Sequence, residues 1–182
     1  RMAISHSGAF ALGAGTSFQL IPELDLGIVV LTNGAPVGVA EAVATQFTDL
    51  VQYGEVTRDW VTDAAGFFAA YTAPSGDLVD ETRPADATAP PPAERLIGKY
   101  ESDYFGVLLI ERQNGNLVAR LGPTGNVTLK LNEWDGSTFE YSPLSESAPA
   151  GSMASAVFAD DGSSVTLTSF DAQGLGTWRR VA

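Results

Sequence analysis

Hydrophobic and polar positions along the chain change their pattern several times, and the first stretch predicts strands. Residues 4–12 and 16–32 have the composition of two β-strands. The residues between them, 13–15, are Gly-Ala-Gly, whose glycines permit the positive φ angles of a tight hairpin. The second strand ends in the continuous apolar run 27–31, which is typical of a strand covered on both faces. We therefore expect the chain to begin with a hairpin inside a packed sheet.

Helical spacing follows the turn predicted at residues 33–34. Pro36 suits a first helical turn, where its missing N–H costs no hydrogen bond. Gly54 is expected to end this helix, and Thr57 is expected to cap a second, short helix that stops before Pro74. The apolar residues that recur along one face of the first helix are Val39, Val43, Phe47, Leu50 and Val51.

Beyond Pro74 the composition changes twice. Residues 74–95 combine prolines with alanine, aspartate and threonine and hold almost no large apolar residue, which is typical of a semi-extended linker. Residues 96–182 show short alternating segments separated by turn signals, which indicates a small antiparallel barrel or sandwich. A barrel of about eight strands can be filled by its own side chains or can hold one small ligand. The expected strands lie near residues 98–103, 105–112, 116–121, 126–132, 137–142, 153–159, 164–170 and 175–181.

Composition and charge narrow the classes of function. The net charge is −12 and the only lysines are Lys99 and Lys130, which argues against a nucleic acid or an anionic membrane surface as partner. The absence of cysteine excludes disulfides and cysteine-based zinc sites. No apolar run reaches the ~20 residues of a membrane span. Because the acidic residues are spread along the chain, their simplest effect is on solubility.

One short motif, residues 5–9 on the first predicted strand, carries candidate chemistry. It reads Ser-His-Ser-Gly-Ala and holds the single histidine, His6. Taken alone, a histidine between two serines is more often a hydrogen-bonded surface residue than a catalytic one. The motif resembles the third active-site motif of serine β-lactamase-like hydrolases, a family that includes penicillin-binding proteins, D-aminopeptidases and esterases. In that family a Lys-Thr-Gly or His-x-Gly triplet on an edge strand lines the substrate cleft.

The last region carries a second resemblance. Residues 96–101, 104–106 and 133–139 are similar to the lipocalin-like barrel appended after the catalytic domain of many β-lactamase-like hydrolases. The two resemblances occur in the order of that architecture and together imply an α+β chain. Its expected parts are the β-hairpin and C-terminal helix of a catalytic domain (1–54), a connecting helix (55–73), a Pro-rich linker (74–95) and an antiparallel eight-stranded lipocalin-like barrel (96–182).

The resemblance also implies roles for the motif residues. His6 would take the place of the family's lysine and donate to a substrate carboxylate or to the catalytic tyrosine. Ser7 would hydrogen-bond substrate, Gly8 would let the substrate backbone approach closely, and the backbone N–H of Ala9 would be an oxyanion donor. Histidine in place of lysine favours peptidase or esterase activity over resistance to β-lactams. No serine has a lysine three positions later, so we expect the Ser-x-x-Lys nucleophile upstream of Arg1 and no catalysis by this chain alone.

The parent enzyme implied by the resemblance hydrolyses an ester or a small peptide amide through an acyl-enzyme, with no metal and no cofactor. Its expected partners are the N-terminal catalytic portion of the same protein, a small-molecule or peptide substrate, and a second copy of itself. The expected location is extracytoplasmic in a bacterium. Without a companion, the hairpin at residues 4–32 should expose an open edge and an apolar patch. The alternative is a ligand-binding or assembly module, with a barrel that holds an apolar ligand and residues 1–54 as scaffold.

Overall fold

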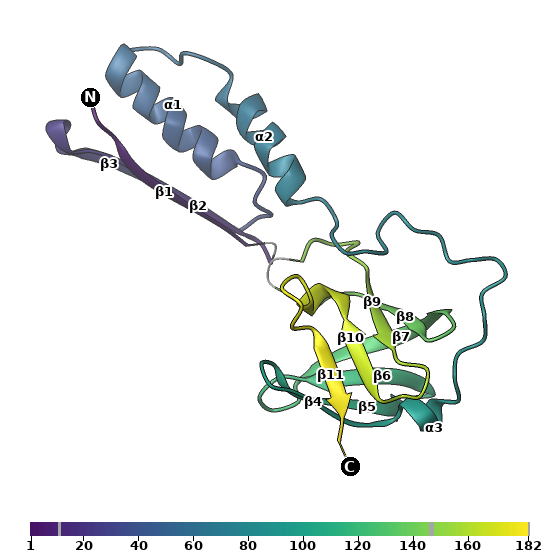
Figure 1. Ribbon diagram of the computed structural model, residues 1–182. Coiled ribbons are helices and arrows are strands. Elements are labelled where there is room, and N and C mark those ends of the chain that lie inside the picture. The colour runs from purple at the N-terminus through teal and green to yellow at the C-terminus, as the bar shows by residue number, and fades with distance from the viewer. Residues whose placement is uncertain (11, 146–147, 182) are drawn as a thin grey trace. The chain divides into compact units, whose positions relative to one another are not determined.

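The computed structural model describes residues 1–10, 12–145 and 148–181 (Figure 1). The chain divides into two compact units, Arg1–Ala73 and Pro74–Ala182. None of the helices in these described ranges combines the length and apolar character needed to cross a membrane.

The first unit is a three-stranded antiparallel sheet with a helix along one face (Figure 1). Strands β1 (Ile4–Phe10), β2 (Ala14–Ile21) and β3 (Leu26–Thr32) lie side by side in that order, with β2 in the centre. Helix α1 (Val39–Tyr53) covers one face, and α2 (Trp60–Tyr71) packs against α1. In the described part of this unit β1 is therefore an edge strand, and one face of the sheet is uncovered.

Residues 16–32 form two strands, so the prediction of one continuous strand was wrong. Pro22 begins a single turn of 3-10 helix, because its fixed φ angle suits a first helical turn. Asp25 follows in the left-handed region with a φ of 49°, and this reverses the chain from β2 into β3. Sequence periodicity missed the reversal because apolar residues flank the turn on both sides.

The apolar run in β3 is covered on one face within the described residues, where the sequence predicted cover on both. Ile28 and Val30 pair with the β2 residues that face α1, and both are half-buried. Val29 and Leu31 point to the other face and are 66% and 73% exposed. The uncovered face thus consists of side chains that would favour burial.

The helix ends follow the predictions in part. Gly54 ends α1 with a φ of 81°, as expected, and its N–H donates to the Leu50 carbonyl at 3.0 Å. The helix begins at Val39, later than Pro36 suggested. Asp59 rather than Thr57 caps α2, since its carboxylate accepts the Thr62 N–H at 3.1 Å.

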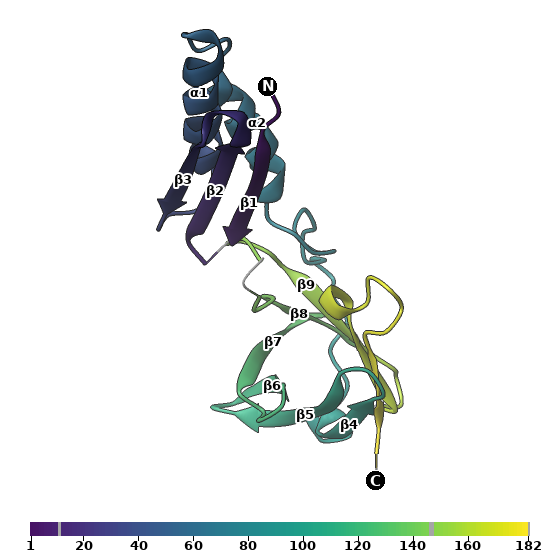
Figure 2. The same cartoon turned by 90° about the vertical axis from the view of Figure 1, so that its left-hand side faces the viewer.

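The second unit is a closed antiparallel barrel of eight strands, which confirms the predicted barrel (Figure 2). The barrel closes where β11 pairs with β4, so it has no open sheet edge. Residues 168–170 form a 3-10 turn where the sequence predicted the end of a strand. The strands are β4 (Gly98–Ser102), β5 (Gly106–Gln113), β6 (Asn116–Leu121), β7 (Val127–Asp135), β8 (Thr138–Tyr141), β9 (Ala154–Phe158), β10 (Ser164–Leu167) and β11 (Thr177–Arg180).

Large aromatic side chains fill the barrel. Trp178, Tyr100, Tyr141 and Phe139 are all at most 2% exposed and belong to one continuous core. The polar atoms among them have partners: Trp178 Nε1 donates to the Gly106 carbonyl at 3.0 Å, and the Tyr100 hydroxyl donates to the Leu96 carbonyl at 2.8 Å. Of the two possibilities left by the sequence, the structure favours a barrel filled by its own side chains.

The segment predicted as a linker lies against the barrel wall. The N–H of Thr88 donates to Asp135 Oδ1 at 2.7 Å, and the Thr88 carbonyl accepts the Gly136 N–H at 2.9 Å. Arg83 Nε donates to the Trp134 carbonyl at 2.9 Å. A short helix, α3 (Ala93–Leu96), then leads into β4. Residues 74–92 are therefore a fixed strap of the second unit rather than a free linker, because strand ends of the barrel supply hydrogen-bond partners.

Hydrogen bonds to Asp77 hold the start of this strap against the barrel. Its carboxylate accepts the Ser155 N–H at 3.0 Å, the Ser155 hydroxyl at 2.6 Å and the Thr168 hydroxyl at 2.6 Å. Burial alone would raise the pKa of Asp77, but these hydrogen bonds outweigh it and lower the pKa below 3.8. A lowered pKa stabilises the fold above the unfolded-state value, and the contribution is lost as the pH falls through the folded-state value.

We expect Asp77→Asn to lower the free energy of unfolding by about 1 kcal/mol at neutral pH, a small figure because solvent reaches the carboxylate. The difference from wild type should shrink as the pH falls below 3.8. Urea unfolding at a series of pH values measures it, with Asp80→Asn in the same strap as control. A difference that stays constant down to low pH would contradict the assignment.

Candidate active-site strand

The motif at residues 5–9 lies in the middle of β1. Side chains alternate along a strand, so His6 and Gly8 lie on the uncovered face of the sheet. His6 pairs across the ladder with Phe18, and their rings stack with centroids 6.4 Å apart and planes at 15°. The imidazole is exposed, which leaves its nitrogens accessible from the uncovered face.

Ser7 faces the opposite way, toward α1. Its hydroxyl donates to the carboxylate of Glu41 in the first turn of that helix. The structure thus places Ser7 and His6 on opposite faces of the strand. While it donates to Glu41, the Ser7 hydroxyl can still accept a hydrogen bond from a substrate N–H, but it can donate to a substrate only if it releases Glu41.

Ala9 has its backbone at the free edge of β1. The Tyr71 hydroxyl, from the last residue of α2, donates to the Ala9 carbonyl at 2.8 Å. In an antiparallel ladder a residue directs its C=O and its N–H to the same side. The Ala9 N–H therefore also points away from β2, to the edge where an oxyanion donor would have to lie.

Gly8 sits opposite Thr16 in β2. A Cβ at this position would lie 2.9 Å from Thr16 Oγ1, which is closer than side chains normally allow. The close contact with β2 thus also favours glycine at position 8, in addition to its predicted role of letting a substrate approach.

A buried carboxylate holds the two helices behind this strand together. Asp49 on α1 accepts hydrogen bonds from the Thr57 hydroxyl at 2.6 Å, the Trp60 indole N–H at 2.6 Å and the Thr57 N–H at 2.9 Å. These bonds, that of the Thr57 hydroxyl foremost, lower the pKa of Asp49. The network fixes the start of α2, and so directs Tyr71 at its far end toward the edge of β1.

Sequence reasoning missed Tyr71, Glu41 and Asp49 as neighbours of the motif. Neither Tyr71 nor the two acidic residues belong to a local sequence pattern that marks them as site residues. Their contacts span up to 62 positions of sequence, so only the fold brings them together. In the described residues no cluster of His, Asp and Glu has the composition of a metal site.

Apolar side chains share the uncovered face with His6. Five large ones from all three strands are between 42% and 73% exposed. Scattered apolar residues are normal at protein surfaces, but a contiguous apolar sheet face is typical of an interaction site. These residues are Ile4, Phe10, Leu20, Val29 and Leu31.

Comparisons with known proteins agree on the nature of the second unit. Residues 82–175 match a family described as a domain of unknown function, DUF3471, and the chain belongs to this family. A crystal structure of the C-terminal domain of penicillin binding protein Rv0907 is 35% identical, with a TM-score of 0.50, and the match covers 55% of this chain and 95% of that one. No curated protein matches the chain. The barrel is thus a C-terminal domain of the penicillin-binding-protein type, as the sequence resemblance implied.

Proposed function

We propose that this chain supplies the third-motif strand and the C-terminal barrel of a serine hydrolase that cleaves an ester or a small peptide amide. The carrying observation is the barrel's similarity to the C-terminal domain of a penicillin binding protein. Supporting it, the His-Ser-Gly-Ala motif lies upstream of that barrel on an edge strand, with the Ala9 backbone directed outward. The alternative, a module without any catalytic role, lacks a comparable observation.

In this mechanism a serine on the upstream portion attacks the substrate carbonyl, and the ester C–O or amide C–N bond breaks as the alcohol or amine leaves with the proton of the serine hydroxyl. Water then hydrolyses the acyl-enzyme to the acid and the free serine. The Ala9 N–H donates to the oxyanion that develops in each tetrahedral intermediate. His6 donates from the uncovered face to a carboxylate of the substrate or to the catalytic tyrosine of the upstream portion. This chain contributes the hydrogen-bond donors, the Ala9 N–H and His6, and the upstream portion contributes the nucleophile.

The uncovered apolar face supports the same proposal. Val29 and Leu31 on β3 and Leu20 on β2 would be buried if further strands and helices of the catalytic portion completed the sheet. Burying apolar surface contributes roughly 25 cal/mol per Å², so covering this face would stabilise the assembled enzyme. His6, on the edge strand of this face, would then lie at the junction of the two portions.

The test is to assay p-nitrophenyl ester hydrolysis by the chain alone and by the chain combined with its upstream catalytic portion. The chain alone should be inactive, and the combination should be active and insensitive to EDTA. Mass spectrometry after incubation with a fluorophosphonate should find the label on a serine of the upstream portion. Labelling of a serine within residues 1–182, or loss of activity in EDTA, would overturn the proposal.

His6→Ala should lower kcat/KM of the combined enzyme by about 10- to 100-fold, the worth of one hydrogen bond that involves a charged group. His6→Lys, which restores the residue more common in this motif, should retain more activity than the alanine variant. Ser5→Ala on the same strand is the matched control. Steady-state kinetics measure the effect, and an alanine variant with wild-type kinetics would remove His6 from the site.

A further inference from the structure

One end of the barrel departs from the apolar pattern of its interior. Arg112 on β5 and Glu133 on β7 occupy positions whose side chains should point inward. Glu133 pairs across the ladder with the buried Phe139, which confirms its inward register. The inward residues that precede the two charged ones are Leu108 and Ile110 on β5 and Leu129 and Leu131 on β7. Two charged groups thus replace the next apolar layer at this mouth.

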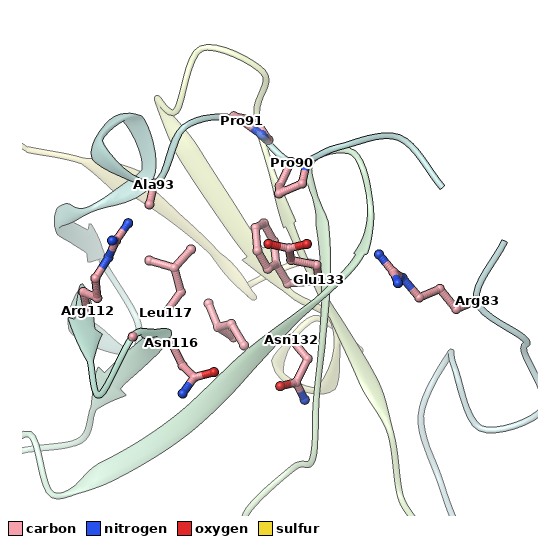
Figure 3. Close-up of a pocket in the computed structure, with 12 residues that line it drawn as sticks. Arg83, Pro90, Pro91, Ala93, Arg112, Asn116, Leu117, Asn132 and Glu133 are labelled. Atoms are coloured by element: carbon pink, nitrogen blue, oxygen red, sulfur yellow. The ribbon is translucent and has the colours of Figure 1, made fainter. Parts of the chain in front are cut away.

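The strap forms one wall of an open pocket of about 450 Å³ that these charged residues line (Figure 3). Pro90 and Pro91 form part of its wall, and Arg83 reaches it from an earlier part of the strap. In Figure 3 the guanidinium groups of Arg112 and Arg83 lie on opposite sides, with the Glu133 carboxylate between them. The volume falls within the range of pockets that bind small molecules.

The pocket has an apolar floor, formed by Leu117, Leu131 and Phe139. Leu131 and Phe139 belong to the barrel core and are at most 3% exposed, and Leu117 packs against them. A ligand seated here would contact a fixed apolar surface below and charged groups at the sides.

The charged groups are largely unused by the described residues. The Glu133 carboxylate forms no hydrogen bond or ion pair with any of them. Arg112 reaches only Glu94, at 3.6 Å and in solvent, which is a weak ion pair. The Nε–H of Arg83 donates to the Trp134 carbonyl, which orients the guanidinium group and leaves its two terminal nitrogens available to a ligand. Two cations therefore flank one anion in a protein whose net charge is −12.

We propose that this pocket binds a short peptide with free termini. Arg112 would bind the peptide carboxylate, Glu133 would bind its ammonium group, and an apolar side chain would lie on the Leu117 floor. A plain anion would leave Glu133 unpaired and a plain cation would face two arginines, whereas a ligand with both charges pairs with Arg112 and Glu133 at once and therefore fits best. The site lies wholly within the second unit and does not depend on the proposed hydrolase activity.

Titration calorimetry of the whole chain with the dipeptide Ala-Leu tests the proposal. Saturable binding is expected, and both N-acetyl-Ala-Leu and Ala-Leu-amide should bind about 5-fold more weakly, the upper range for exposed ion pairs. Glu133→Gln should weaken Ala-Leu by a similar factor and abolish its advantage over the acetylated peptide. Arg112→Gln should abolish its advantage over the amide.

Two further variants sharpen the test. Glu94→Gln frees Arg112 from its ion pair and should tighten binding of Ala-Leu. Lys130→Gln removes an exposed charge on β7 outside the pocket lining and should change nothing. Circular dichroism checks that each variant keeps the barrel. The proposal is overturned if Ala-Leu does not bind saturably, or if neither Glu133→Gln nor Arg112→Gln changes its affinity.

Discussion

Replacing Ala9 with proline should lower kcat/KM of the assembled hydrolase by about 100- to 1,000-fold, the usual cost of one oxyanion donor. Proline replaces the backbone N–H with a ring carbon, and at Ala9 that position faces away from β2. Proline is tolerated on an edge strand when the missing N–H would face outward, so the ladder stays intact. The carbonyl that accepts from Tyr71 is also retained. Single-turnover acylation kinetics with an ester substrate measure the loss at the chemical step.

Ser5→Pro is the matched control for this variant. Ser5 lies four residues earlier with its backbone directed to the same free edge, but outside the expected oxyanion position. It should leave kcat/KM within a few-fold of wild type. An equal loss in both variants would mean that proline distorts β1 and would remove the oxyanion role from Ala9.

The barrel could be predicted from the sequence because its signals are local. Alternation of apolar and polar residues and turns such as Asn114-Gly115 mark each strand within a few positions. The division of residues 16–32 into β2 and β3 could not be predicted in this way, since Leu24 and Leu26 continue the apolar pattern across the turn. Pro22 is the local signal of this turn, while the left-handed conformation of Asp25 is seen only in the structure.

The candidate site also has a part that is visible in the local sequence and a part that is not. The motif at residues 5–9 is contiguous and could be recognised, but the groups that constrain it come from distant helices. The Ser7 hydroxyl donates a hydrogen bond to Glu41, and the Tyr71 hydroxyl donates one to the Ala9 carbonyl. The strap was misjudged for a related reason: its composition cannot form a core, but the barrel provides Asp135 and Trp134 as partners. Sequence composition predicts the structure that a segment can form by itself. The positions of the motif and of the strap depend instead on tertiary hydrogen bonds to residues far away in the sequence.

Trp178→Ala should destabilise the barrel by about 3–5 kcal/mol, the range for removing a buried tryptophan or phenylalanine from a core. Trp178 is fully buried, stacks at 5.4 Å with Phe105 and meets the edge of Phe170 at 5.7 Å. Its loss would leave a cavity and free the Gly106 carbonyl. Against a typical total stability of about 5–15 kcal/mol, the variant should be partly unfolded at physiological temperature.

Two further variants separate packing from hydrogen bonding at this position. Trp178→Phe keeps an aromatic ring but loses the indole N–H, and should cost less than the alanine variant. Tyr104→Ala removes an aromatic side chain that is 70% exposed and should change stability by no more than about 0.5 kcal/mol. Urea unfolding followed by near-ultraviolet circular dichroism ranks the three. If Trp178→Ala proved as stable as Tyr104→Ala, packing of the aromatic interior would not be the main source of the barrel's stability.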